Sequence, residues 1–224
     1  MMQDALKAMV ARAALAYVNP GELIGVGTGS TVDKFIDALG LIGAEMAGAV
    51  SSSNASSARL TARGIRVFDC ADVGEIAVYI DGADEIDANG CMIKGGGGAL
   101  TREKIVAAQS RQFICIADES KKVEVLGHFP LPVEIIPMAR GRIMRQFAEM
   151  GARAQLRCVD GVPYVTDNGQ HILDVHGLHI TNPLAFEEDV SQWPGVVCVG
   201  VFARQRASCC LLGTPGGVRT LNFA

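Results

Sequence analysis

The sequence predicts an α/β protein in which a mostly parallel sheet is followed by a smaller α+β unit. Helical and strand patterns alternate as far as Pro130, which is typical of a parallel sheet with helices on its faces. After Phe129-Pro130-Leu131-Pro132 the texture changes and shorter strands dominate. The chain has 224 residues, 49% of them apolar, which suffices for a main domain and a companion that bury their own cores.

The elements of the first part follow from apolar runs and the turn residues that bound them. A helix is expected over residues 4–18, where an amphipathic pattern ends at Asn19-Pro20-Gly21. Short apolar runs predict strands at residues 23–26, 47–50, 65–68, 75–80 and 113–117. Further helices are expected after GTGST as far as Leu39, after SSSNASS as far as Gly64, and from Ala99 onward.

The second part reads as a split βαβ unit with an antiparallel sheet. Its expected elements are a strand at 132–137, a helix at 138–150, strands at 152–159, 162–166 and 171–176, a helix at 183–192 and a strand at 196–203. The closing ASCCLLGTPGGVRTL predicts one more strand and a tail. Whether these return to the first sheet stays open at this point.

Composition narrows the range of functions. The net charge of −4 argues against a general binder of nucleic acid or of anionic membranes. No apolar run approaches the roughly 18 residues of a membrane span, and the opening MMQDALKAMVARAALAYV lacks a signal-peptide pattern. Seven cysteines without a C-x-x-C pair predict reduced, mostly buried thiols rather than a disulfide framework.

The segment VGTGST (26–31) joins a strand to a helix through glycines. Backbone N–H groups at a helix N-terminus attract an anion, and the hydroxyls of Ser30 and Thr31 add donors. An ordinary βα turn with a capping hydroxyl explains the same residues equally well. The segment lacks the lysine of a nucleotide P-loop and the spacing of G-x-G-x-x-G, so a nucleotide cofactor gains little support.

The segment IDGADEID (80–87) carries an apolar strand into a tight acidic turn. Asp81 falls at the carboxyl end of its strand, where open α/β sheets bind ligands. Together with Asp84 it is able to share protons or to hold sugar hydroxyls, although Asp-Gly is also an ordinary turn signal. Glu85 and Asp87 are expected to be solvated, and the spacing does not fit a calcium loop.

The segment KGGGGALTREK (94–104) is the most unusual. Lys94 ends a short strand, CMIK, and is expected to point into the same cleft as the acids. The four glycines that follow allow backbone to lie against a substrate. Glu103 falls in or near the first turn of the next helix, where it either stabilises the helix dipole or, once desolvated, serves as a base.

Two further groups of residues are weaker candidates. Lys121 follows the strand FICIA, where it either neutralises an anion or forms a solvated pair with Lys122. His171 and His176 flank Asp174 on an alternating strand that does not place all three on one face, so no metal site is expected. The residues alone thus predict a metal-free proton-transfer site at one rim, for a small phosphorylated or carboxylated substrate.

In this order and spacing, GVGTGST, SSSNASS, DGADEID and KGGGGALTREKI closely resemble ribose-5-phosphate isomerase, type A. The likeness continues through FICIADESK, LPVEIIP, ILDV and GTPGGVRTL. The resemblance implies interconversion of D-ribose 5-phosphate and D-ribulose 5-phosphate in the pentose phosphate pathway, with no metal or organic cofactor. It also implies a cytoplasmic homo-oligomer, either a dimer or a tetramer. The implied fold is a Rossmann-like domain at 1–128 and 204–224 with a ferredoxin-like α+β lid domain at 129–203.

The resemblance also implies a role for each site residue. Glu103 looks like the family's general base, which moves a proton between C2 and C1 through a cis-enediolate, and Lys94 looks like the cation that stabilises the oxygen charge. Asp81 and Asp84 resemble the acids that manage hydroxyl protons and help to open the sugar ring. The matching substrate-binding positions are Thr28, Gly29, Ser30, Thr31, Asp81, Gly82, Ala83, Asp84, Lys94, Gly95, Gly96, Gly97 and Lys121, with Lys7 as a further phosphate contact.

Three other functions compete with this reading. A non-catalytic sugar-phosphate sensor on the same fold would need neither Glu103 nor Lys94. A CoA-transferase-like enzyme using Glu103 as nucleophile would need a CoA site, for which the sequence offers no motif. A sugar kinase would need the nucleotide loop that is missing here.

Overall fold

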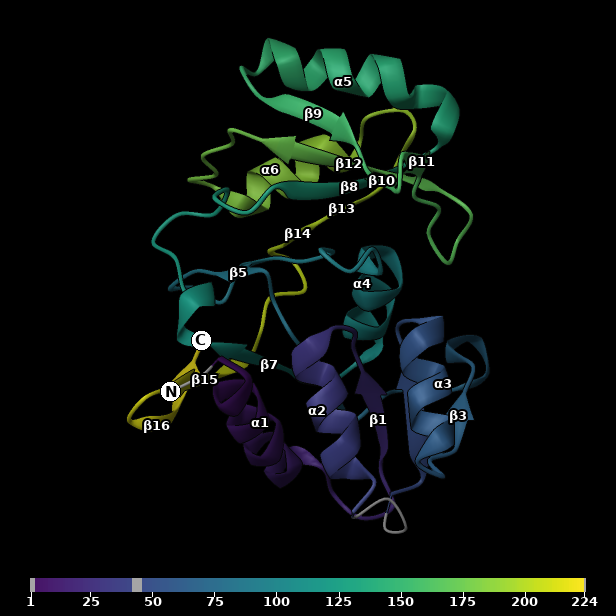
Figure 1. The fold of residues 1–224 in the computed structure, drawn as a ribbon, viewed down its shortest axis with the longest axis vertical. Helices are drawn as coiled ribbons and strands as arrows, with labels where there is room; N and C mark the ends of the chain where they lie inside the picture. The colour runs from purple at the N-terminus through teal and green to yellow at the C-terminus, as the bar shows by residue number, and fades with distance from the viewer. Residues whose placement is uncertain (1–2, 42–45, 224) are drawn as a thin grey trace. The chain divides into compact units, whose positions relative to one another are not determined.

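The computed structural model describes residues 3–41 and 46–223, and the chain divides into two compact units (Figure 1). Unit 1 comprises Met1–Ala83, Arg102–Lys122 and Ala207–Ala224, and unit 2 comprises Asp84–Thr101 and Val123–Arg206. Unit 2 contains the predicted smaller domain. It also takes in residues 84–101, which the sequence grouped with the first part.

Unit 1 is built on a sheet of seven strands in the order β16-β15-β7-β4-β1-β2-β3. The strands are β1 Leu23–Val26, β2 Gly48–Ser51, β3 Val67–Phe68, β4 Val78–Asp81, β7 Phe113–Asp118, β15 Cys209–Thr214 and β16 Gly217–Asn222. All neighbours pair in parallel except β15 and β16. The predicted α/β class with a mostly parallel sheet is therefore confirmed.

The C-terminal segment returns to this sheet and ends as a strand. Leu211 of β15 pairs in parallel with Ile116 of β7 and antiparallel with Thr220 of β16. The predicted tail is therefore wrong. Pro215 and Gly216 form a tight hairpin turn, which Gly217 completes with a φ of 116° that favours glycine.

Helices cover both faces of the seven-stranded sheet. They are α1 Gln3–Ala13, α2 Ser30–Leu39, α3 Asn54–Ala62 and, for most of its length, α4 Leu100–Gln109. Ile24 of β1 packs in the core cluster with Phe35 of α2. Gly25 faces the opposite side, where an added Cβ would lie 2.8 Å from Val106 of α4. The longest described helix, α1, has 11 residues, and none of the described helices is long and apolar enough to cross a membrane.

The ends of α3 follow the sequence signals. Ser53 caps the helix, because its Oγ accepts the N–H of Ser56 at 3.1 Å. Gly64 follows the last turn with a φ of 75° and donates its N–H to the carbonyl of Thr61 at 2.9 Å. Both the predicted start and the predicted end of this helix are thus confirmed.

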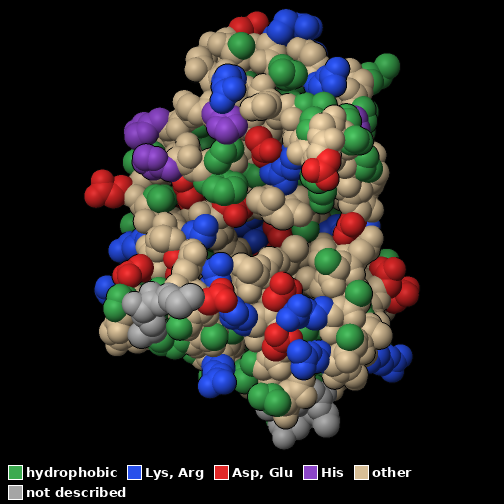
Figure 2. Space-filling view, viewed as in Figure 1, with side chains coloured by type: hydrophobic (Ala, Val, Ile, Leu, Met, Phe, Trp, Pro, Cys, Tyr) green, Lys and Arg blue, Asp and Glu red, His purple; other side chains and the backbone are tan. Residues whose placement is uncertain are grey.

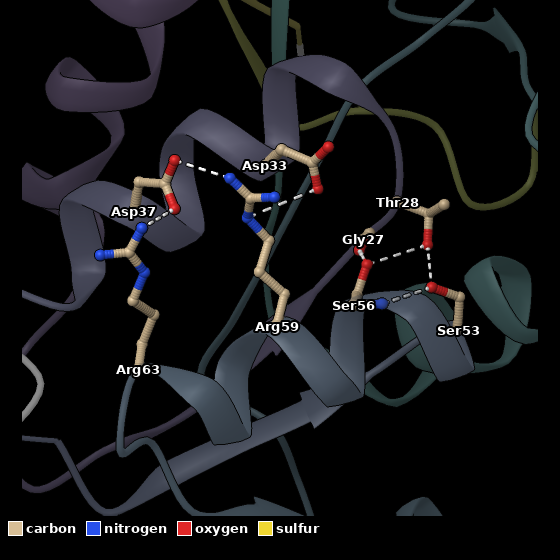
Figure 3. Close-up of polar contacts among 8 residues, drawn as sticks. All are labelled: Gly27, Thr28, Asp33, Asp37, Ser53, Ser56, Arg59 and Arg63. Atoms are coloured by element: carbon tan, nitrogen blue, oxygen red, sulfur yellow. Dashed lines mark hydrogen bonds and ion pairs between the residues drawn. The ribbon is translucent and has the colours of Figure 1, made fainter.

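Ion pairs tie α2 to α3 on the surface. Asp37 binds the guanidinium groups of Arg59 and Arg63, each at an N–O distance of 2.7 Å (Figure 3). The hydrogen bond from Arg59 is the main reason that the pKa of Asp37 lies below its ordinary value. Figure 2 shows acidic and basic side chains interspersed on this face of the molecule.

Unit 2 contains a four-stranded antiparallel sheet in the order β13-β8-β12-β9. Its elements in chain order are β8 Leu131–Ile135, α5 Arg140–Glu149, β9 Arg153–Leu156, β12 His171–His176, α6 Pro183–Ser191 and β13 Val196–Val199. A short hairpin of β10 Cys158–Val159 and β11 Val162–Pro163 lies between β9 and β12 in the chain. The predicted antiparallel sheet of this part is confirmed.

Three short strands of unit 2 form a separate sheet in the order β14-β6-β5. They are β5 Glu85–Ile86, β6 Met92–Ile93 and β14 Val201–Phe202. Gly200 separates β13 from β14: its N–H donates to the carbonyl of Pro132 at 2.8 Å and its carbonyl accepts the N–H of Lys94 at 2.9 Å. The predicted short strand before Lys94 is confirmed as β6, which pairs only within this small sheet.

Candidate active site

The carboxyl ends of β1 and β4 meet where the order of the parallel strands reverses, which is where open α/β sheets bind ligands. Asp81, the last residue of β4, is completely buried there. Its Oδ1 accepts the N–H groups of Thr28 at 3.1 Å and of Gly82 at 2.7 Å, and its Oδ2 accepts the hydroxyl of Tyr79 at 2.5 Å. Three donors from two strand ends therefore fix the orientation of this carboxylate.

Glycines are required in the loop between β1 and α2 for two different reasons. At Gly27 the backbone lies against Asp81, because an added Cβ would be 1.9 Å from Cγ of that residue. At Gly29, which begins α2, the φ of 112° favours glycine. The carbonyl of Gly29 accepts the N–H of Asp33 at 2.9 Å, which starts the helix.

The serine-rich loop after β2 holds the same segment from the side (Figure 3). Thr28 Oγ1 donates to Ser53 Oγ at 2.7 Å, and Ser56 Oγ donates to the carbonyl of Gly27 at 2.7 Å. The sequence pattern assigns these serines only to a loop and a helix cap. The signal for the further role was a run of hydroxyl side chains directly after a strand of the parallel sheet.

Lys7 of α1 reaches the N-terminus of α2. Its Nζ donates to Ser30 Oγ at 2.9 Å, while Ser30 is exposed and Thr31 is partly exposed. The first turn of a helix and an ammonium group both favour a bound anion. The structure therefore brings together Lys7, Ser30 and Thr31, which the sequence connected to phosphate binding.

Glu103 lies in the first turn of α4 and is only 3% exposed. Burial raises the pKa of Tyr79 well above 10, and the charges of Asp81 and then Glu103 raise it further. The Tyr79 hydroxyl is therefore protonated and donates to Asp81. Asp81, Glu103 and Tyr79 all belong to unit 1, and the charges of both carboxylates act on the Tyr79 hydroxyl.

Lys121 follows β7, the strand next to β4. It ends the 3₁₀ turn Glu119–Lys121 and is half-buried. Nearby Asp118 is 2% exposed. Burial acts to raise the pKa of Asp118, but hydrogen bonds from Ser120 and Gln3 and the charge of Lys121 outweigh it, so the pKa is lowered. Lys121 thus places a positive charge close to the carboxyl edge of the sheet.

Unit 2 holds the remaining predicted residues. Asp84 donates its N–H to the carbonyl of Ile93 at 2.9 Å, and its Oδ2 accepts the N–H of Gly96 at 2.7 Å. Lys94 is 2% exposed, and its ammonium group lies 5.5 Å from the ring centre of Phe202. The glycine loop that begins at Gly95 therefore connects a buried cation to an oriented carboxylate.

Two acids of the 80–87 segment are buried, which corrects the prediction that they are solvated. Glu85 is 3% exposed and accepts the N–H groups of Gly127, at 2.8 Å, and of Phe129. Asp87 is 7% exposed, and its Oδ1 accepts the N–H of Cys91 at 2.9 Å. Both carboxylates satisfy backbone donors of nearby loops, so these two acids of the turn stabilise the fold.

Histidine and cysteine side chains are common ligands of metal ions. No cluster of three or more His, Cys, Asp or Glu side chains in the part of the chain that the structure describes is suited to a metal ion. Asp174 instead binds Arg157, with Oδ1 2.5 Å from Nη2. None of the seven cysteines, all of which lie in the described ranges, forms a disulfide; four of them are buried, and Cys158 is exposed.

Comparisons with known proteins identify the family. The sequence profile of Ribose 5-phosphate isomerase A (phosphoriboisomerase A) matches residues 48–217. The ribose-5-phosphate isomerase A of Polaromonas sp. is 68% identical over 227 residues, which cover 100% of this chain and 95% of that protein. The crystal structure of ribose 5 phosphate isomerase A from Neisseria gonorrhoeae matches with a TM-score of 0.95 at 46% identity, covering 100% of this chain and 98% of that one.

A third match is a D-ribose-5-phosphate isomerase solved in complex with phospho-erythronic acid. It has a TM-score of 0.94 at 36% identity and covers 99% of this chain and 100% of that one. The fold and these matches place the protein among the aldose–ketose isomerases. The chain belongs to the ribose 5-phosphate isomerase A family, whose reaction interconverts ribose 5-phosphate and ribulose 5-phosphate.

Proposed function

We propose that this chain interconverts D-ribose 5-phosphate and D-ribulose 5-phosphate, a step of the pentose phosphate pathway, by proton transfer through a cis-enediolate. The observation that carries the proposal is 63–68% identity over the full chain to curated ribose-5-phosphate isomerases of type A. The homologue that binds phospho-erythronic acid supports the intermediate. A carboxylate, like an enediolate, spreads negative charge over two neighbouring oxygens.

Proton abstraction beside a carbonyl requires a base and a stabilised oxyanion, and positioned acid–base groups contribute roughly 10²–10⁴-fold. Glu103 is the base, a role that its burial in the first turn of α4 supports. Lys94, also buried, is the cation that stabilises charge on the substrate oxygens. Asp81 and Asp84 manage the hydroxyl protons and assist ring opening, a role that their fixed orientations support.

The phosphate binds at Thr28, Gly29, Ser30 and Thr31, where the N-terminus of α2 and the contact from Lys7 favour an anion. The sugar is bound by the backbone at Gly82, Ala83, Gly95, Gly96 and Gly97, and Lys121 supplies a further positive charge. The reaction needs no metal and no organic cofactor, because the hydrogen only moves from one carbon to its neighbour. The partner is a small phosphorylated sugar rather than a nucleic acid or a membrane.

The same proposal includes the domain classes and the assembly. The doubly wound sheet of unit 1 supports a Rossmann-like domain at 1–128 and 204–224. The β-α-β-β-α-β order of β8 to β13 supports a ferredoxin-like domain at 129–203. From the family resemblance we also propose a cytoplasmic homo-oligomer, a dimer or a tetramer.

The test is ribulose 5-phosphate formation from ribose 5-phosphate by the EDTA-treated protein in D₂O. We expect turnover, with deuterium incorporated at the carbon that receives the proton, because an enediolate exchanges the abstracted proton with solvent. Turnover with no deuterium at all would indicate a hydride shift and contradict the enediolate. Binding of ribose 5-phosphate without any turnover would instead favour a sensor.

Glu103→Gln is the matching variant, because it removes the base and keeps the side-chain size. We expect it to bind ribose 5-phosphate and to lose roughly 10²–10⁴-fold in kcat. Glu75→Gln is the control, since the Glu75 side chain is 66% exposed and pairs with Arg111 on the surface. Equal activity of Glu103→Gln and Glu75→Gln would refute the role of Glu103.

A further inference from the structure

One arginine holds the glycine loop that follows Lys94. Arg157 lies between β9 and β10, and all three of its guanidinium nitrogens donate hydrogen bonds. Nε and Nη2 bind the two carboxylate oxygens of Asp174 at 2.9 and 2.5 Å. Nη1 donates to the carbonyls of Gly95 at 3.1 Å and Gly96 at 3.0 Å. The bidentate pair with Asp174 fixes the plane of the guanidinium and so the direction of Nη1.

A single peptide connects Arg157 to Asp84. The carbonyl of the Gly95–Gly96 peptide accepts from Arg157, and the N–H of the same peptide donates to Asp84 Oδ2 at 2.7 Å. In a trans peptide these two groups point in opposite directions, and the described residues contain no cis peptide bond. The guanidinium therefore sets the direction from which Asp84 is bound, and its charge polarises the peptide toward that carboxylate.

Tyr164 contacts the next residues of the loop. Its hydroxyl lies 3.4 Å from the carbonyl of Gly97, and an added Cβ at Gly98 would be 2.5 Å from the same hydroxyl. Arg157 and Tyr164 thus contact three successive carbonyls. Glycine has the largest conformational freedom to lose on folding, so this loop depends on side chains elsewhere for its order.

We propose that Arg157, oriented by Asp174, is a positioning residue that fixes the glycine loop after Lys94 and, through it, Asp84. The inference rests on the proposed roles of Lys94 and Asp84. It assigns Asp174, for which the sequence predicts no metal-binding role, the function of orienting Arg157. A lysine at position 157 is a point charge and does not reproduce the fork that binds a carboxylate and two carbonyls at once.

The experiment compares Arg157→Met, Arg157→Lys and Asp174→Asn with the wild type in steady-state kinetics on ribose 5-phosphate. Arg157→Met is expected to lower kcat about 10²-fold, the cost of misplacing reacting groups by about 1 Å, while KM changes far less. The kcat values of Arg157→Lys and Asp174→Asn are expected to lie between those of Arg157→Met and the wild type. Added methylguanidinium is expected to restore part of the lost kcat in Arg157→Met. Arg153→Met, at an exposed position of β9, is the matched control and should behave as wild type.

A purely structural role would lower the midpoint of thermal unfolding and leave kcat per folded molecule unchanged. A kcat within about twofold of wild type in folded Arg157→Met therefore overturns the proposal. If Arg157→Met fails to fold, the same criterion applies to Asp174→Asn, which keeps the size of the side chain. An inactive wild type would overturn the proposed function itself, whereas an active wild type with fully active variants would overturn only the positioning role.

Discussion

Replacing Gly27 with alanine should lower the activity of the candidate site by displacing the side chain of Asp81. An alanine Cβ at this position would lie 1.9 Å from both Cγ and Oδ1 of Asp81, whereas non-bonded carbon atoms prefer about 3.5–4.0 Å. The two groups must therefore separate by about 1.6 Å. Asp81 is completely buried and held by Thr28, Gly82 and Tyr79, so the movement breaks hydrogen bonds that orient the carboxylate.

Two magnitudes follow from this separation. Overpacking a well-packed interior costs about 1–3 kcal/mol of unfolding free energy. Misplacing a reacting group by about 1 Å costs about 10²-fold in turnover. The assay is urea unfolding together with kcat and KM on ribose 5-phosphate, for Gly27→Ala and for Gly74→Ala as control. An added Cβ at Gly74 meets nothing within 4 Å, so that variant should match wild type.

A Gly27→Ala protein with wild-type kcat and wild-type stability would refute this reasoning. It would mean that the loop between β1 and α2 shifts as a whole at little cost and that Asp81 keeps its geometry. A loss of stability without a loss of kcat would separate the two effects. In that case packing at Gly27 matters for folding, but the orientation of Asp81 does not limit the reaction.

Two more predictions concern carboxylates outside the proposed reaction. Arg59 holds the pKa of Asp37 below its unfolded value of about 3.8. The ionised Asp37 side chain therefore stabilises the fold fully above that pH, and this stabilisation is lost as the pH falls through the folded pKa. Asp37→Asn should therefore cost about 0.2–1 kcal/mol at pH 7 and less as the pH falls below 3.8, and a cost in urea unfolding that stays the same between pH 7 and about pH 2 contradicts this. Glu134 is completely buried and accepts the hydroxyls of Thr101 and Thr166. Glu134→Ala should therefore lower the unfolding free energy by about 1–3 kcal/mol, whereas a value equal to that of the exposed control Glu149→Ala would show that the cluster adds nothing.

The sequence predicted the parallel sheet and its loops because the signals there are local. A buried strand followed by glycines and hydroxyls specifies a strand, a turn and a helix start within a few residues. The loop from Gly27 to Thr31, the cap at Ser53 and the strand that ends at Asp81 all follow from such short patterns. The position of Asp81 at the reversal of strand order then follows from topology.

The separate small sheet and the burial of Glu85 were not predictable in this way. Two-residue strands such as β5 and β6 carry no periodicity. β5 pairs with β6, and β6 pairs on its other side with β14, more than 100 residues further on. Glu85 is buried because its carboxylate binds N–H groups at 127 and 129. A solvated acid and a buried one that binds distant backbone donors look the same in sequence, since the donors are supplied by another part of the chain.

The four glycines after Lys94 show how an unusual run can have several separate causes. Gly95 has a φ of 99° and Gly98 a φ of 84°, both of which favour glycine over any other residue. At Gly96 an added Cβ would lie 2.6 Å from Oδ1 of Asp84, so a side chain there would displace the carboxylate rather than strain the backbone. Replacement of Gly96 should therefore reduce turnover more than stability, whereas replacement of Gly95 or Gly98 should reduce both. Gly96 thus allows the backbone to lie close to Asp84, and Gly95 and Gly98 allow the turn itself. In the proposed arrangement, Arg157 restricts the flexibility that these glycines give to the loop.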